Sequence, residues 1–183
     1  MNITVYTEST PNPSTMKFIV NKLLINGSVD FPTKASAEHS KFATELYKFN
    51  FVNGVFFASN FVTVTKTEDA TWADIEPILK EFVKGALESE YAVQENVEEE
   101  NLNFTGTETE IKIQQILNDY VRPAVEQDGG AISYRSFADG IVTVELRGSC
   151  SGCPSSTITL KSGIQSLLQR MVPEVKEVVS EAL

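Results

Sequence analysis

Cysteine and histidine are scarce in this chain of 183 residues. There are two cysteines, Cys150 and Cys153, and one histidine, His39. A small secreted domain held together by disulfides normally carries more cysteines at wider spacings. The chain is therefore not expected to be a disulfide scaffold. In a reducing compartment, a close cysteine pair indicates redox chemistry or metal binding.

Basic residues and long apolar runs are also few. Lys and Arg total 15 against 25 Asp and Glu, for a formal net charge of −10. This balance argues against nonspecific binding to nucleic acid or to anionic membranes, which requires Lys and Arg. No uncharged apolar run approaches the roughly 18 residues of a membrane span.

The start, MNITVYTESTPNP, resembles neither a signal peptide nor a presequence. We expect a cytoplasmic protein, most simply in a bacterial cytosol, although a mature organellar protein would look the same.

Charge divides the chain into parts. Residues 88–107, ESEYAVQENVEEENLNFTGT, hold six glutamates and no basic residue. Like charge and few strongly apolar side chains predict an extended, flexible acidic linker. The alternative for this segment is a solvated helix, because glutamate favours helices. The chain as a whole is 42% hydrophobic, enough for packed cores. We therefore predict two small domains, residues 1–87 and 108–183, on either side of the linker.

The first domain has the pattern of a mixed α+β fold. Alternation and turn residues predict strands at 3–6 and 16–20, and a hairpin of 55–58 and 61–64 around Ser59-Asn60. Helical spacing predicts a helix over 36–49 capped by Ser36, and another capped by Thr71, with Pro77 as a candidate position for a kink. The loop Thr10–Pro13 is either a recognition loop or a rigid connection. Phe56 and Phe57 are adjacent on a strand, so they face opposite sides and one of them is a candidate for an exposed docking residue.

The second domain repeats the mixed α+β character. Apolar residues at helical spacing predict a helix from Ile113 onward, kinked at Pro123 and ended by Asp128-Gly129-Gly130. Strands follow at 132–137 and 141–147, with Val142, Val144 and Leu146 on one face. A helix containing Ile164 and Leu168 ends before Pro173, and a short strand is expected at 175–180.

The two cysteines lie between the second strand of this domain and the helix that Pro154 opens. Free amides at a helix N-terminus favour nearby thiolates, and two thiolates suit a soft metal. Zinc sites and iron–sulfur clusters usually take four protein ligands, so one chain supplies half a set. His39 is in the other domain and is expected to be a surface or capping residue. The missing ligands therefore point to a second copy, in a homodimer with two-fold symmetry.

A C-x-x-C pair alone leaves three alternatives: a thiol–disulfide oxidoreductase, a zinc ion bridging two chains, or a cluster carrier. A thioredoxin-like enzyme carries its pair early, in a β-α-β unit, with a later cis-proline loop. Here the pair comes late and follows a hairpin, which disfavours the oxidoreductase. Four thiolates suit zinc and iron–sulfur equally, so those two alternatives stay open.

Two long segments resemble a known family. Residues 121–175, which contain VRPAVEQDGG, ELRGSCSGCPSSTITLKSGI and VPEV, resemble the C-terminal domain of the NifU-like (Nfu-type) iron–sulfur cluster carriers. Residues 3–87, with TESTPNPSTMKF and GVFFASNFVTVTK, are similar to the N-terminal domain of many of them. One departure is Ala131, where the family usually has an acidic residue after the glycine pair.

The resemblance implies a function. It implies a non-enzymatic carrier that holds a labile 4Fe-4S cluster between two subunits, with Cys150 and Cys153 as ligands and no catalytic residue. Its partners would be an upstream scaffold and apo iron–sulfur recipient proteins. The second hypothesis remains a zinc-bridged homodimeric interaction module.

Overall fold

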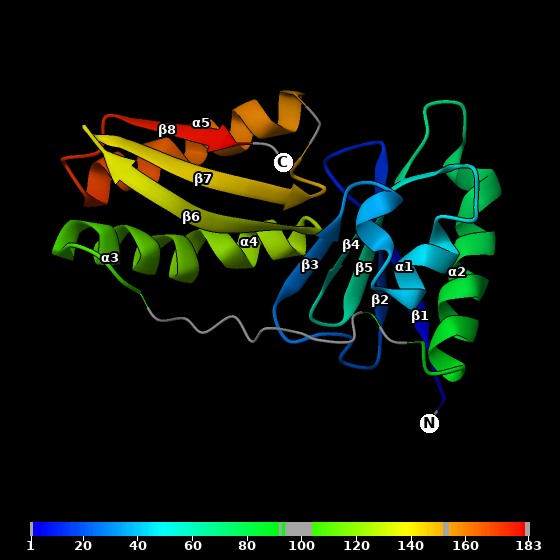
Figure 1. The fold of residues 1–183 in the computed structure, drawn as a ribbon. Coiled ribbons are helices and arrows are strands. Elements are labelled where there is room, and N and C mark those ends of the chain that lie inside the picture. Colours follow the sequence, from blue (N-terminus) through cyan, green and yellow to red (C-terminus); the bar gives the residue numbers. More distant parts are fainter. Residues whose placement is uncertain (1, 92, 94–103, 152–153, 182–183) are drawn as a thin grey trace. The chain divides into compact units, whose positions relative to one another are not determined.

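The computed structural model describes residues 2–91, 93, 104–151 and 154–181. The chain divides into two compact units, Met1–Glu100 and Asn101–Leu183, each built from a sheet and helices (Figure 1). The predicted α+β fold class is confirmed. Residues 92 and 94–103 of the predicted acidic linker lie outside the described residues. The boundaries 1–87, 88–107 and 108–183 therefore remain a prediction.

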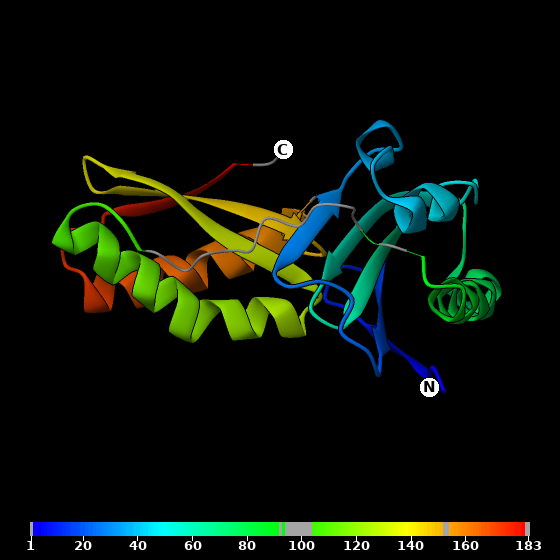
Figure 2. The same cartoon turned by 60° about the horizontal axis from the view of Figure 1, so that its bottom comes forward.

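The first unit is an antiparallel sheet in the order β1-β2-β5-β4-β3. Helices α1 and α2 lie on the same side of this sheet (Figure 2). Their apolar stripes close a core with one face of the strands, and Phe18, Phe42 and Leu79 are completely buried in it. The elements are β1 (Val5–Ser9), β2 (Thr15–Val20), β3 (Ser28–Phe31), α1 (Lys41–Leu46), β4 (Val52–Ala58), β5 (Phe61–Lys66) and α2 (Trp72–Glu88).

The predicted hairpin of the first unit is present. Strands β4 and β5 pair around Ser59-Asn60, and Ser59 takes a positive φ of 48° in the turn. Strand β1 begins two residues later than predicted, at Val5, and continues to Ser9. The short strand β3 was not predicted, because its four residues, Ser-Val-Asp-Phe, alternate polar and apolar side chains over only two periods.

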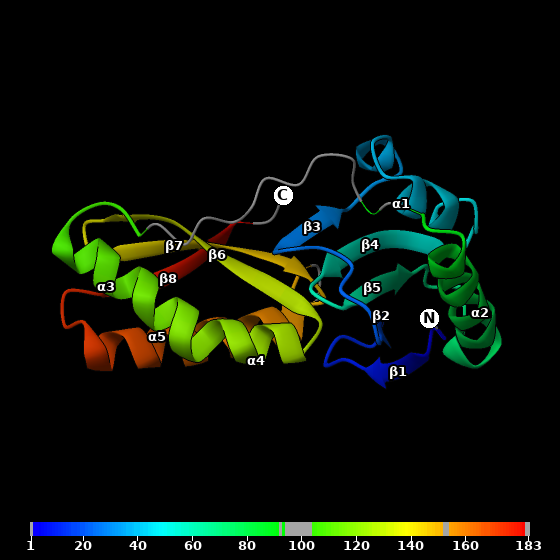
Figure 3. The same ribbon diagram turned by 90° about the horizontal axis from the view of Figure 1, so that it is seen from below.

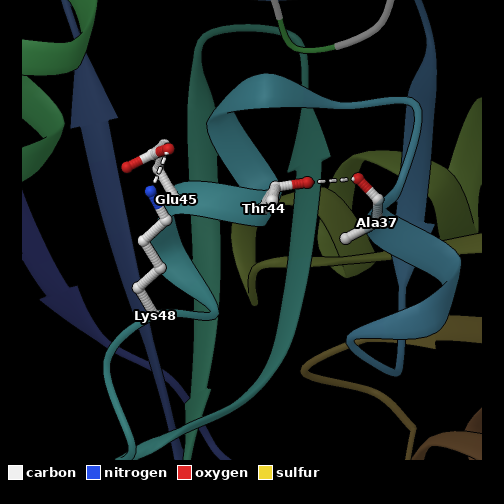
Figure 4. Close-up of polar contacts among 4 residues, drawn as sticks. All are labelled: Ala37, Thr44, Glu45 and Lys48. Carbon is white, nitrogen blue, oxygen red and sulfur yellow. Dashed lines mark hydrogen bonds and ion pairs between the residues drawn. The ribbon is translucent and has the colours of Figure 1, made fainter.

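The single helix predicted over residues 36–49 is wrong. The segment forms a 3-10 turn, Ala35–Ala37, followed by the separate helix α1. Ser40, and not Ser36, caps α1, because its side chain accepts a hydrogen bond from the Ala43 amide at 3.1 Å. The Thr44 hydroxyl then donates to the Ala37 carbonyl oxygen at 2.7 Å and ties α1 to the turn (Figure 4). Such local side-chain bonds compete with a continuous helix.

The expectation that one of Phe56 and Phe57 is exposed is also wrong. Their exposed fractions are 1% and 0%. Phe57 packs against Phe42, with ring centroids 5.1 Å apart, and Phe56 packs against Phe61 at 6.2 Å. An exposed phenylalanine on this strand is therefore not available as a docking residue.

The loop Thr10–Pro13 is a fixed connection. The Thr10 hydroxyl donates to the Asn12 carbonyl oxygen at 2.9 Å, and the indole N–H of Trp72 donates to the Pro13 carbonyl oxygen at 2.9 Å. Trp72 is the first residue of α2 and follows Thr71, which lies at the cap position but makes no side-chain capping hydrogen bond, contrary to the prediction. The loop is thus held to the start of the helix by a bond between residues distant in sequence.

The second unit is a sheet in the order β6-β7-β8, covered on one face by its helices (Figure 3). Strands β6 and β7 are antiparallel, and β8 lies parallel to β7. Val142, Val144 and Leu146 of β7 share one buried face, as predicted. The elements are α3 (Glu108–Ile116), a π-helical segment (Leu117–Val121), α4 (Arg122–Gln127), β6 (Gly130–Ala138), β7 (Ile141–Gly148), α5 (Pro154–Met171) and β8 (Glu177–Glu181).

Near Pro123, where a kink was predicted, the helix changes type. The chain passes from α3 through the π-helical segment Leu117–Val121, and Pro123 then lies in the first turn of α4. A missing N–H costs least in a first turn. Helix α4 ends at Gln127, and Gly129 has a positive φ of 82°, in agreement with the predicted stop. The helix predicted to end before Pro173 ends at Met171.

Candidate metal site

Cys150 lies two residues after the end of β7, where the chain turns tightly. Gly148 ends β7 with a positive φ of 66°. The Ser151 hydroxyl and amide both donate to the Gly148 carbonyl oxygen, at 2.8 and 3.1 Å. The Ser149 hydroxyl donates to the Asp128 carbonyl oxygen, and the Ser149 amide donates to the Gly129 carbonyl oxygen at 3.3 Å. The loop is thereby fixed both to itself and to the end of α4.

The Cys150 side chain is buried. Its exposed fraction is 6%, and it belongs to the apolar core of the second unit. Burial raises the pKa of the Cys150 thiol to about 11, since a thiolate loses hydration there. A hydrogen bond between the Ser149 and Cys150 side chains opposes this rise, whereas the nearby Asp128 carboxylate adds to it.

The electrostatic expectation for this thiol is therefore wrong. The sequence predicted that amides at the start of the helix would favour a thiolate. At Cys150 the loss of hydration is the largest effect, and it favours the protonated thiol. A bound metal would reverse this balance, because its positive charge deprotonates a coordinating thiol.

The second predicted ligand, Cys153, lies outside the described residues, so its role as a ligand remains a prediction. Pro154 begins α5, as expected from the sequence. His39 is exposed between the 3-10 turn and α1, in the first unit. Within the described ranges no three or more His, Cys, Asp or Glu side chains gather in a way that could hold a metal. A complete ligand set is therefore not assembled by this part of the chain.

Sequence reasoning missed Gly130 as a residue of the site. It was assigned only to the end of a helix, but it begins β6 and lies against the Cys150 side chain. The pairing of Gly130 with Gly148 across β6 and β7 creates this contact. The signal in the sequence was a glycine, Gly130, shortly before the strand predicted to pair with the one that ends just before the cysteines.

The described helices also bear on membrane association. In the parts of the chain that the structure covers, no helix combines the length and apolar character required to cross a bilayer.

Comparison with protein families assigns both units. Residues 5–90 match the family model described as "Scaffold protein Nfu/NifU N terminal", and residues 113–179 match the model described as "NifU-like domain". The second match contains Cys150 and Cys153. Each match falls within one of the two compact units.

Curated relatives match across nearly the whole chain. The human "NFU1 iron-sulfur cluster scaffold homolog, mitochondrial" is 40% identical over 180 residues, covering 95% of this chain and 70% of the relative. The protein of the same name from Drosophila erecta is 38% identical over 180 residues, covering 95% and 63%. "NifU-like protein 4, mitochondrial" from Arabidopsis thaliana is 40% identical over 188 residues, covering 97% and 65%.

The chain thus spans a little under two thirds of the length of the fly and plant relatives. Its similarity includes both matched domains in their order along the chain. The chain belongs to the Nfu-type family of NifU-like proteins.

Proposed function

We propose that this protein is an iron–sulfur cluster scaffold that binds a 4Fe-4S cluster through Cys150 and Cys153 and passes it to apo-proteins. The observation that carries the proposal is the position of Cys150. It follows β7, where the hydrogen bonds of Ser149 and Ser151 hold the chain, inside the unit that matches the NifU-like domain. The names of the relatives, which describe iron–sulfur cluster scaffolds, support the same assignment.

The number of cysteine ligands per chain implies a cluster site shared between two chains. A 4Fe-4S cluster usually takes four thiolates, and each chain has two cysteines. Two copies related by a two-fold axis would supply the complete set, with the cluster at their boundary. A cluster in this position is cargo rather than a buried structural centre, because separation of the two copies exposes it to an acceptor.

Transfer requires no catalytic residue in this scheme. The acceptor's thiolates replace those of Cys150 and Cys153 on the iron atoms, and the cluster keeps its oxidation state. The buried position of Cys150 favours release, since the departing thiolate takes up a proton as it returns to an apolar site. The same property argues against an oxidoreductase, in which the attacking cysteine of a C-x-x-C pair has a lowered pKa.

The partners and the location belong to the same proposal. Recipients are apo-proteins that offer free thiolates, and the donor is an upstream scaffold. The net charge of −10 supports the absence of nucleic-acid and membrane partners. The cytoplasmic location predicted from the sequence stays a prediction, and the three relatives named above are mitochondrial proteins by name.

Anaerobic reconstitution of the full chain with iron and sulfide tests the proposal. We expect a brown dimer with about four irons and four sulfides per two chains. Both Cys150→Ala and Cys153→Ala should lose the cluster. Ser166→Ala, on the exposed side of α5, serves as the matched control that keeps it. Mass measurement under anaerobic conditions reports the oligomeric state.

Three results would overturn the proposal. A zinc content of about one ion per dimer in protein isolated anaerobically, without cluster formation, would favour the zinc-bridged module. Reduction of insulin disulfides by the monomer would indicate a catalytic dithiol. A complete cluster held tightly by a single chain would exclude the shared site.

A further inference from the structure

Gly130 is the residue that leaves room for the Cys150 thiol. It is buried at the first position of β6 and pairs with Gly148, the last residue of β7. Cys150 follows two residues after Gly148, so the chain turns back over the start of β6. The two residues are 20 positions apart in sequence, yet they are neighbours in the fold.

A side chain at position 130 would have no free space. A Cβ atom placed there would lie 2.7 Å from the Cys150 Sγ and 2.7 Å from the Arg147 carbonyl oxygen. It would also lie 3.2 Å from the Cys150 Cβ. Carbon atoms in protein interiors pack at about 3.5–4.0 Å, so a methyl group cannot be accommodated without movement.

The strand pairing determines which group must move. The Arg147 carbonyl belongs to the ladder between β6 and β7, in which Ala131 pairs with Arg147 and Gly130 with Gly148. Moving it would disturb backbone pairing next to the loop. A rotation about χ1 moves the Cys150 Sγ atom away and relieves its 2.7 Å contact, while the looser 3.2 Å contact with the Cys150 Cβ remains. The Sγ atom is therefore the more easily displaced of the two neighbours.

We propose that Gly130 is a positioning residue for the ligand Cys150, and that its missing side chain forms the seat in which the Sγ atom is held. This inference rests on the proposed function for its consequence in cluster binding. It does not rest on that function for the contact itself, which can be tested in protein without a cluster. A side chain at position 130 displaces the Sγ atom from the core and from the geometry in which it meets iron.

The primary test measures how fast the Cys150 thiol reacts. The full chain is prepared without cluster, with Cys153→Ser so that Cys150 is the only thiol, and is treated with iodoacetamide under native conditions. We expect protection of at least about tenfold relative to the unfolded chain, because the thiol is buried. Gly130→Ala should remove most of this protection. Gly163→Ala, in α5 of the same unit, has no atom within 4 Å of the added Cβ and should leave the rate unchanged.

A double-mutant cycle covers the case in which Gly130→Ala is poorly folded. Thermal unfolding of Gly130→Ala, Cys150→Ala and the double variant reports whether the two positions are coupled. We expect Gly130→Ala to cost less stability when the Sγ atom is absent. Equal cost in both backgrounds, or an unchanged alkylation rate in a folded Gly130→Ala variant, would overturn the proposal.

Reconstitution with iron and sulfide then separates the two proposals. In the chain with both cysteines, Gly130→Ala should shorten the lifetime of the cluster severalfold relative to Gly85→Ala, a control in α2 where the added Cβ meets nothing. If the unmodified chain does not bind a cluster, the proposed function is rejected. The alkylation rates would still show whether Gly130 holds the Cys150 Sγ atom in place. A normal cluster lifetime in a Gly130→Ala variant with an exposed thiol would reject the positioning role.

Discussion

The turn between β6 and β7 depends on the conformations of two individual residues. Asp139 and Gly140 both have positive φ, at 54° and 87°. Two successive positive values are typical of the tight hairpin turn that follows the right-handed twist of paired strands. Asparagine, aspartate and glycine tolerate this region better than other residues, which explains the sequence Asp-Gly at this point.

At this scale we predict that Gly140→Ala destabilises the second unit by about 1–3 kcal/mol. The added Cβ would be held at a φ that side chains rarely adopt and would approach the Glu174 carbonyl oxygen to 3.0 Å. Thermal unfolding measures the effect, with Gly163→Ala as a control in an exposed helix position. Equal stability of the two alanine variants would contradict the role assigned to the turn.

At the scale of elements, the start of α3 is fixed by a reciprocal cap. The Thr107 side chain accepts from the Glu110 amide at 3.3 Å, and the Glu110 carboxylate accepts from the Thr107 amide at 2.8 Å. The carboxylate also accepts from the Tyr134 hydroxyl of β6 at 2.9 Å. These bonds join the cap to the sheet and hold the pKa of Glu110 below its usual value of 4.5.

The lowered pKa of Glu110 gives a prediction with a definite sign. The ionised carboxylate stabilises the fold at pH values above 4.5, and this contribution is lost as the pH falls through the lowered pKa. Glu110→Gln should therefore lower the melting temperature at about pH 7 and have a smaller effect at about pH 3. Glu108→Gln, in the same first turn, is the control for the loss of charge at the helix start. If Glu110→Gln lowers the melting temperature by the same amount at both pH values, the carboxylate does not act through its charge.

Helix α5 carries an exposed apolar residue near the cysteine pair. Ile158 has an exposed fraction of 64%, and residues 148–160 contain no charged side chain. At a two-fold interface each residue near the axis meets its own copy, so a charge there would oppose itself. A stretch of sequence without charge around the cysteines suits the proposed dimer.

We predict that Ile158→Glu weakens the cluster-bound dimer and speeds loss of the cluster. The change should alter the stability of the monomer by less than about 0.5 kcal/mol, because the side chain is exposed. Ile141→Glu is the matched control, since Ile141 is 38% exposed at the other end of β7 from Cys150. Anaerobic mass measurement and decay of the cluster's visible absorbance give the two readouts. Equal behaviour of both variants would place the dimer contact elsewhere.

At the scale of the whole molecule, the two units have separate apolar cores. One core contains residues from the strands β1 to β5 with α1 and α2, and the other contains residues from β6 to β8 with α3, α4 and α5. The predicted acidic linker between them would keep a recipient bound by the first unit at high effective concentration near the cluster.

Deletion of residues 1–87 tests this division of labour. We expect the shortened chain to bind the cluster, because both cysteines and the second core remain. Transfer to physiological acceptors should be slower, since the second attachment point is lost. The measurement is the rate of cluster transfer from the shortened chain, compared with that from the full chain. An unchanged rate would reject a role for the first unit in selecting recipients.

Elements that depend on local patterns could be predicted from the sequence. The Asp139-Gly140 and Ser59-Asn60 turns, the buried face of β7, the stop after Gln127 and the helix beginning at Pro154 all follow from neighbouring residues. The same is true of the position of Cys150 between a strand and a helix. Local patterns failed over residues 36–49, where the hydroxyls of Ser40 and Thr44 split one apolar stripe into a turn and a short helix.

The environment of the site could not be predicted from the sequence, because it arises from tertiary packing. The burial of Cys150, the direction of its pKa and its contact with Gly130 arise from residues brought together by the pairing of β6 with β7. The burial of both Phe56 and Phe57 could not be predicted either, because the alternation of a strand does not show whether both of its faces are covered. Hydration and steric contact depend on all atoms within a few ångströms, whereas a sequence pattern specifies only neighbours along the chain.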